Sequence, residues 1–161
     1  MDEKQNGPEN RAAQPNNVKN VFDYECMMYR EMSRLLNCDI FKNPSPLKNA
    51  IVESLLLHTR ILVNILLSGE KSDDDITLEM VYPNISSHDK TKNDIDGLKE
   101  AYNYESPTEP SPRKTLNKMF AHPTTHRSDH YDYTSILVKI TPSINSILEK
   151  IRKYDTPQSN G

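Results

Sequence analysis

The stretch Leu47 to Leu67, LKNAIVESLLLHTRILVNILL, decides the fold, because no other segment of the chain is apolar on more than one face. On the helical period of about 3.6 residues, two neighbouring apolar rows run along it. The first row holds Leu47, Ile51, Leu55, Leu62 and Ile65 or Leu66, and the second holds Val52, Leu56, Val63 and Leu66. Two apolar rows require at least two partner helices, so the stretch is predicted to be the central helix of a small bundle.

A polar row lies on the same predicted helix. It contains Glu53, Leu57, Arg60 and Asn64, which are spaced three or four residues apart and therefore share one side. Because we expect this helix to be largely buried, a carboxylate, a guanidinium and an amide are predicted to lie inside the protein. His58 lies apart from them, beside the first apolar row.

Apolar residues at helical spacing predict further helices on both sides of the central one. These cover about 18–37, 94–104, 113–121 and a stretch from Ser128 or Asp132 to Tyr154, with a short piece near 76–81. Ser45-Pro46 and Ser111-Pro112 each place a capping residue before a proline, as at a helix start. Pro142 is expected to kink the last helix without breaking it. The sequence therefore predicts an all-α fold, an up-and-down bundle of four to five helices.

The ends of the chain differ in composition from its middle. Residues 1–17 and 155–161 lack apolar periodicity and are rich in Asn, Gln, Pro and Gly, so both are predicted to be disordered tails. A hydrophobic content of 35% in 161 residues is low for one domain and agrees with partial disorder. The predicted bundle domain covers residues 18–154.

The sequence indicates a soluble protein of a reducing compartment. Lys48, Glu53, His58 and Arg60 interrupt the apolar stretch, which argues against a membrane span. No apolar segment follows a basic one at the start, so no secretory signal is predicted. Cys26 and Cys38, expected about 18 Å apart in one helix, cannot form a disulfide with each other and are expected to be reduced. We therefore expect a cytoplasmic protein with no membrane partner.

Charge is segregated along the chain. Residues 70–109 hold eleven acidic residues against four lysines, a net charge of −7, whereas residues 113–130 carry a net charge of +3. The whole chain has a formal charge of −3, which argues against a generally basic nucleic-acid binder. No DNA partner is expected.

Two short motifs suggest a site. Glu53-x4-His58-x-Arg60 lies on the central helix, and Asn117-x4-His122 continues to Arg127 after the short helix. Together, E-x4-H-x-R-x-L and L-N-K-x2-A-H-x-T-x2-R resemble a group of small uncharacterised helical proteins and, more distantly, the HEPN superfamily of helical bundles. The resemblance implies a HEPN-like fold, a plausible homodimer and, in catalytic members, metal-independent RNA cleavage by an arginine and a histidine.

The chemistry of that site suits His122 with Arg127 or Arg60. A histidine can take the 2′-hydroxyl proton near neutral pH, and an arginine can stabilise the charge that develops on phosphorus. The chain departs from the catalytic pattern, because Leu116 occupies the position of the arginine and Arg127 follows His122. Ribonuclease activity is therefore the alternative function, RNA remains a candidate ligand, and enzymatic activity stays open.

The favoured interpretation is structural. Glu53, Arg60, Asn117, His122 and Arg127 are predicted to form one buried polar cluster that fixes the register of the bundle, with His58 as a hydrogen-bonded core histidine. Such a protein would act as a non-catalytic interaction module that binds a partner protein or its own copy. No cofactor is expected.

A metal site is the third alternative. His122, His126 and His130 recur every four residues, a spacing that suits zinc on a continuous helix. Pro123 makes a continuous helix through His122 improbable, and no further Cys or Glu completes a ligand set. The sequence therefore predicts no metal.

Overall fold

The computed structural model describes residues 15–39, 43, 45–67, 75–83, 85, 89–121 and 133–155. Within these ranges the chain forms six helices and no strand, so the predicted all-α class is confirmed. The helices are α1 (Pro15–Leu36), α2 (Pro46–Leu67), α3 (Leu78–Val81), α4 (Asp89–Asn103), α5 (Pro112–Ala121) and α6 (Tyr133–Asp155). Because α3 is a single turn, five helices form the body of the bundle.

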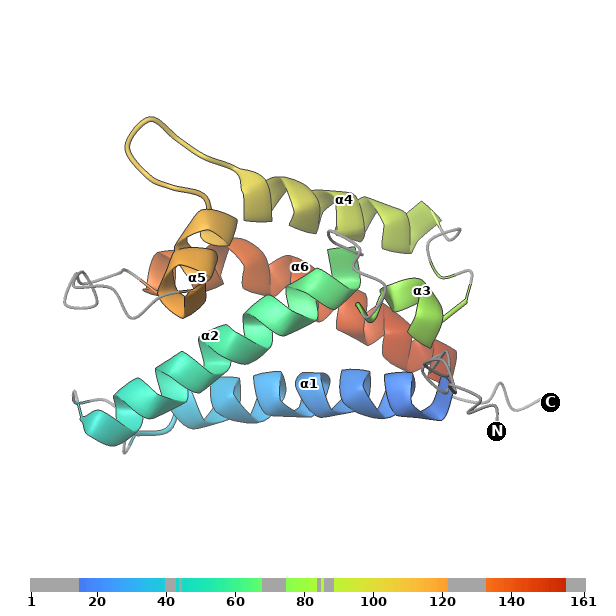
Figure 1. Cartoon of the computed structure of the whole chain (residues 1–161), viewed down its shortest axis with the longest axis horizontal. Coiled ribbons are helices and arrows are strands. Elements are labelled where there is room, and N and C mark those ends of the chain that lie inside the picture. Colours follow the sequence, from blue (N-terminus) through green and yellow to red (C-terminus); the bar gives the residue numbers. More distant parts are fainter. Residues whose placement is uncertain are drawn as a thin grey trace, which may run out of the picture.

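The helix α2 is the centre of the arrangement. It packs along α1 in a helical hairpin, and its opposite side meets α4 and α5, while α6 passes behind it in the view of Figure 1. The second large contact joins α4 to α6. One hydrophobic core includes buried residues from α1, α2, α4, α5 and α6. The prediction of a central helix with several partners is therefore confirmed.

The apolar rows of α2 are buried except at Leu47, which is exposed, and at Val52, which is half-buried. Buried positions include Ile51, Leu55, Leu56, Leu62, Val63, Ile65 and Leu66. Leu47 is 59% exposed, because it lies in the first turn of the helix, beyond the core. The expectation that Leu47 belongs to the buried row is therefore wrong.

The polar row of α2 faces outward. Glu53 and Asn64 are exposed and Arg60 is half-buried, so this side of the helix is not inside the protein. The prediction that Glu53 is buried is wrong, because the two apolar rows already take up the sides of α2 that meet other helices. The helix α2 is long enough to cross a membrane, and an 18-residue stretch of it has a mean hydropathy of 1.7. Half of that stretch is buried inside the bundle.

Helix boundaries differ from the predicted ones at two N-terminal ends. The first helix begins at Pro15, so residues 15–17 are helical rather than part of a tail. The helix α4 begins at Asp89 rather than Asp94. In its first turn, the side chain of Thr91 is only 2% exposed and faces the core. A buried threonine carries no apolar signal, which explains why the early part of α4 was not predicted.

The helix α6 continues through Pro142, as predicted. Proline removes a backbone hydrogen bond and costs about 3 kcal/mol in a helix interior. Burial of Ile136, Ile140, Ile144 and Ile147 on one side of α6 offsets that cost. On the outer side, Val138 is 67% exposed.

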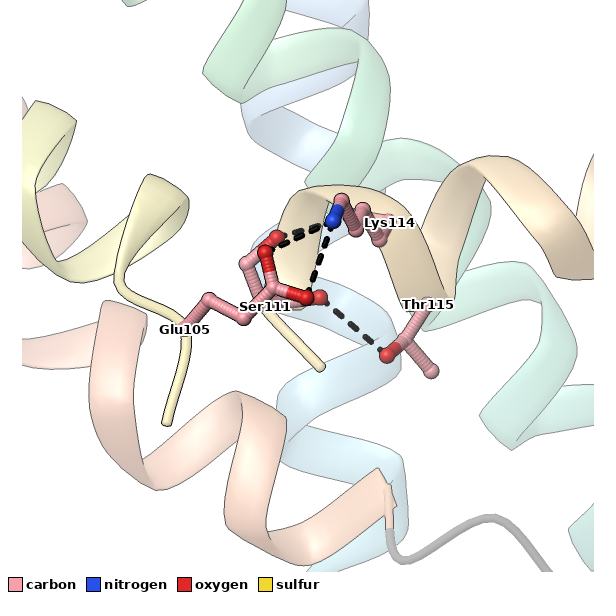
Figure 2. Close-up of polar contacts among 4 residues, drawn as sticks. All are labelled: Glu105, Ser111, Lys114 and Thr115. Atoms are coloured by element: carbon pink, nitrogen blue, oxygen red, sulfur yellow. Dashed lines mark hydrogen bonds and ion pairs between the residues drawn. The ribbon is translucent and has the colours of Figure 1, made fainter. Parts of the chain in front are cut away.

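Both Ser-Pro starts are confirmed. The hydroxyl of Ser45 accepts a hydrogen bond from the backbone N–H of Lys48 at 3.1 Å, which caps α2. At the start of α5, the hydroxyl of Ser111 accepts from the N–H of Lys114 at 3.3 Å, and its carbonyl accepts from the hydroxyl of Thr115 (Figure 2). The ammonium of Lys114 reaches both carboxylate oxygens of Glu105 at 2.7 and 2.9 Å, so the loop after α4 is tied to the first turn of α5.

The two cysteines are free thiols in different surroundings. Cys26 is buried in α1, and burial raises the pKa of its thiol to about 12. Cys38 is half-buried and follows the end of α1, so the expectation that it lies in the same helix is wrong.

Carboxylates join α6 to the elements packed on it. Asp94 of α4 accepts hydrogen bonds from Ser146 at 2.5 Å and from Lys150 at 2.6 Å. Glu109, in the loop after α4, contacts Lys139 at 2.7 Å. Burial raises the pKa of Asp94, but the hydrogen bonds from Lys150 and Ser146 outweigh it, so the pKa lies below its usual value of 3.8. Ionised Asp94 therefore stabilises the packing of α4 on α6.

We expect Asp94→Asn to lower the free energy of unfolding at pH 7 by about 1–2 kcal/mol, because it removes the charged acceptor of Lys150. The folded-state pKa of Asp94 is depressed, so its contribution exists above the unfolded-state pKa and disappears as the pH falls through the folded-state value. In urea denaturation, the difference between variant and wild type should shrink in strongly acidic solution. Asp96→Asn, at an exposed position of α4, is the control. Equal stability of Asp94→Asn and wild type at pH 7 would contradict this role.

Candidate functional site

A buried acid–base pair joins α1 to α2. The Nδ1 atom of His58 lies 2.7 Å from Oε2 of Glu25, and both side chains are buried. A carboxylate only accepts, so the ring N–H donates to it. The ring of Tyr24 meets the His58 ring edge-on, with 5.8 Å between centroids, and covers it from the outside. His58 is thus a hydrogen-bonded core histidine, and its partner is Glu25 of α1.

The sequence carried a signal for this pair. Glu25 falls in the apolar stripe of the first helix, where a charge is costly unless it is paired. In an antiparallel hairpin, residues at similar distances from the connection lie opposite each other, and Glu25 and His58 meet that condition about the connection from Leu36 to Pro46. Combining the stripe with this register would have identified the pair.

A cavity of about 650 Å³ opens over the C-terminal half of α2. Its walls come from α2, from the C-terminal end of α4, from α5 and from the segment before α3. Among the lining residues within the described ranges, Arg60, Lys99 and Arg113 are cationic and Asp75 is the one carboxylate. Three carboxamides, Asn64, Asn103 and Asn117, also line the cavity. It therefore combines a positive charge with many hydrogen-bonding groups.

Tyr102 shows how close two of the cations lie. Burial raises the pKa of its hydroxyl, while the positive charges of Arg60 and Arg113 act in the opposite direction without overcoming burial. Both guanidinium groups are therefore near the same phenol, although Arg60 comes from α2 and Arg113 from α5. The cavity brings together cations that are far apart in the sequence.

Two of the predicted site residues meet here and others do not. Arg60 and Asn117 line the same cavity. Glu53 is exposed and does not line it, and His58 points to α1 instead. His122 and Arg127 lie outside the described residues, and so do His126 and His130. Arg113, Lys99 and Asn103 are lining residues that the motif did not contain.

Large hydrophobic side chains are exposed beside this cavity. The apolar strip comprises Val21, Tyr24 and Met27 of α1 with Leu57 of α2. Tyr24 and Met27 are 50% and 51% exposed, and Val21 reaches the wall of the cavity. Tyr24 of α1 contacts His58 of α2, which directly follows Leu57 in the chain, so α1 and α2 lie side by side here.

No group of three His, Cys, Asp or Glu residues within the described ranges is arranged to hold a metal ion. The histidines of the predicted zinc spacing fall outside those ranges. The candidate site is thus the outer surface of α1 and α2, made of the apolar strip and the cationic cavity.

The buried pair predicts a large coupling between Glu25 and His58. We expect Glu25→Ala or His58→Ala each to lower the free energy of unfolding by about 3–5 kcal/mol, because each leaves a buried polar group without its partner. The double variant Glu25→Leu/His58→Leu should recover most of that loss, since apolar residues of similar volume can replace a buried hydrogen-bonded pair. The exposed Glu31–Arg34 pair is the control, and its removal should cost less than about 1 kcal/mol. Additive losses in a double-mutant cycle measured by urea denaturation would contradict the pairing.

Comparisons with known proteins assign no family to the chain. No family model matches it, and no curated protein or solved structure matches it either. Its function is therefore inferred from the arrangement of its own side chains.

Proposed function

We propose that the protein is a non-catalytic interaction module, a helical bundle of HEPN-like type that acts in the cytoplasm. In this proposal its binding surface is the apolar strip of Val21, Tyr24, Met27 and Leu57, and its ligand is a partner protein. A second copy of the chain is the other occupant that the same surface could accept. The observation that carries the proposal is the exposure of four large hydrophobic residues on two adjacent helices.

The composition of the strip suits a protein interface. Aromatic residues and methionine are enriched at the cores of interfaces, and an exposed apolar group next to polar residues is typical of a docking surface. The cationic cavity lies directly beside the strip, since Val21 contributes to both. The partner is therefore expected to present apolar side chains together with carboxylates.

Rigidity of the two helices supports the same function. The Glu25–His58 pair lies directly beneath Tyr24 and joins α1 to α2. A buried pair of this kind favours one register of the two helices over others. The strip is thus held in one arrangement before a partner binds, which reduces the entropic cost of association.

The alternative function is a metal-independent ribonuclease that uses His122 with Arg127 or Arg60. One observation favours it: Arg60 faces Asn117 and Arg113 of α5, the helix whose last residue, Ala121, directly precedes His122 in the chain. In this alternative, Arg60 would stabilise the charge on the transferring phosphate.

Incubation of the purified chain with labelled single-stranded RNA separates the two functions. We expect no cleavage with or without EDTA, because the proposed interaction module is non-catalytic. The matched variant His122→Ala should behave like the wild type in this assay. Cleavage that resists EDTA and disappears in His122→Ala, with the thermal midpoint unchanged, would instead establish the ribonuclease.

The apolar strip predicts which substitutions abolish association. We expect Tyr24→Glu/Met27→Glu to remove the protein from cross-linked complexes formed in cells and to abolish any self-association seen by sedimentation velocity. Charges placed at the centre of an interface are desolvated on binding, so a loss of at least about tenfold in affinity is expected. Val138→Glu, at an exposed position of α6, is the matched control and should bind like the wild type. If both variants form the same complexes, the strip is not the binding surface.

A further inference from the structure

We propose that the cavity over the C-terminal half of α2 binds a small organic phosphate, a phosphate monoester with a compact body. This cavity adjoins the apolar strip, since Val21 contributes to both, but the inference does not rest on the proposed protein partner. The inference is carried by the charge, the donors and the apolar wall of the cavity.

The charge of the cavity matches a dianion. Among the lining residues that the structure describes, Arg60, Lys99 and Arg113 oppose the carboxylate of Asp75, a net charge of +2 for this set. A phosphate monoester carries about −1.5 to −2 at neutral pH, whereas a simple carboxylate carries one negative charge. Phosphate therefore neutralises the cavity more completely than a carboxylate does.

The kind of cation also favours phosphate. Two of the three are arginines, and a guanidinium can donate two parallel hydrogen bonds to a tetrahedral oxyanion. Arg60 of α2 and Arg113 of α5 line the same cavity from different helices, so one bound group can lie between them. Arg60 is half-buried, which strengthens its interaction with an anion relative to a fully solvated cation.

The rest of the lining indicates an organic ligand. A volume of about 650 Å³ lies in the range of small-molecule sites and is far larger than an inorganic phosphate needs. Ile61, Ile65, Leu67 and Ile76 form an apolar wall, and Asn64, Asn103 and Asn117 supply both donors and acceptors. A body with hydroxyl groups on an apolar frame, such as a sugar or a polyol, suits this combination.

Isothermal titration calorimetry of the full chain tests the proposal. The ligands are ribose 5-phosphate and glycerol 3-phosphate, compared with ribose, glycerol, succinate and inorganic phosphate. We expect saturable binding of at least one ester that is at least about tenfold tighter than inorganic phosphate or succinate, and no binding of the two alcohols. Arg113→Met should weaken ester binding about tenfold or more, because a charge-assisted hydrogen bond is lost.

The controls keep folding and binding apart. Arg152→Met, at an exposed position of α6 outside the cavity, should leave ester affinity unchanged. Arg60→Met should weaken ester binding as Arg113→Met does. If Arg60→Met unfolds the chain, the double variant Lys99→Met/Arg113→Met takes its place in the test, because both of those positions are exposed. Tyr24→Glu/Met27→Glu should bind the ester normally, so failure of the protein-partner proposal does not affect this one.

Several outcomes would overturn the inference. These are the absence of saturable binding by either ester, equal affinities for an ester and its alcohol, or an affinity that Arg113→Met leaves unchanged. Displacement of the bound ester by a single-stranded RNA without a terminal phosphate would identify the cavity as a contact for a nucleic-acid strand instead.

Discussion

The architecture depends on the burial of α2 on two sides at once. Its hydrophobic rows are removed from water because α1 packs along one side of α2 while α4 and α5 pack against another. The remaining outer side of α2 is left to Glu53, Leu57, Arg60 and Asn64. The same constraint that creates the core therefore creates the surface on which Arg60 and Asn64 meet residues of α4 and α5.

Much of the fold could be predicted from the sequence, because it depends on local patterns. The apolar rows of α2, apart from Leu47, and the Ser-Pro starts of α2 and α5 are readable from spacing and capping chemistry, and the structure confirms them. The early turns of α4 could not be predicted, since the residue that turns them inward is a threonine. The local sequence pattern also could not show whether the polar row of α2 faces the core or the solvent, because that depends on where the partner helices pack.

The candidate site was less predictable than the fold. A motif on a single helix indicates which residues share a side, but not which helix faces that side. Arg60 and Asn117 were predicted to lie together and do line one cavity, whereas His58 pairs with Glu25 of the preceding helix. Lys99, Asn103 and Arg113 could not be placed in the site without the packing of α4 and α5 over α2.

The reactivity of the buried Cys26 thiol can report how often the bundle opens. Alkylating reagents attack a thiolate, and a thiol with so high a pKa inside α1 stays protonated and shielded while the bundle is closed. The half-buried thiol of Cys38 lies just beyond the same helix and can react without the helix opening. The ratio of the two labelling rates therefore measures how often α1 separates from its neighbours, without an engineered cysteine.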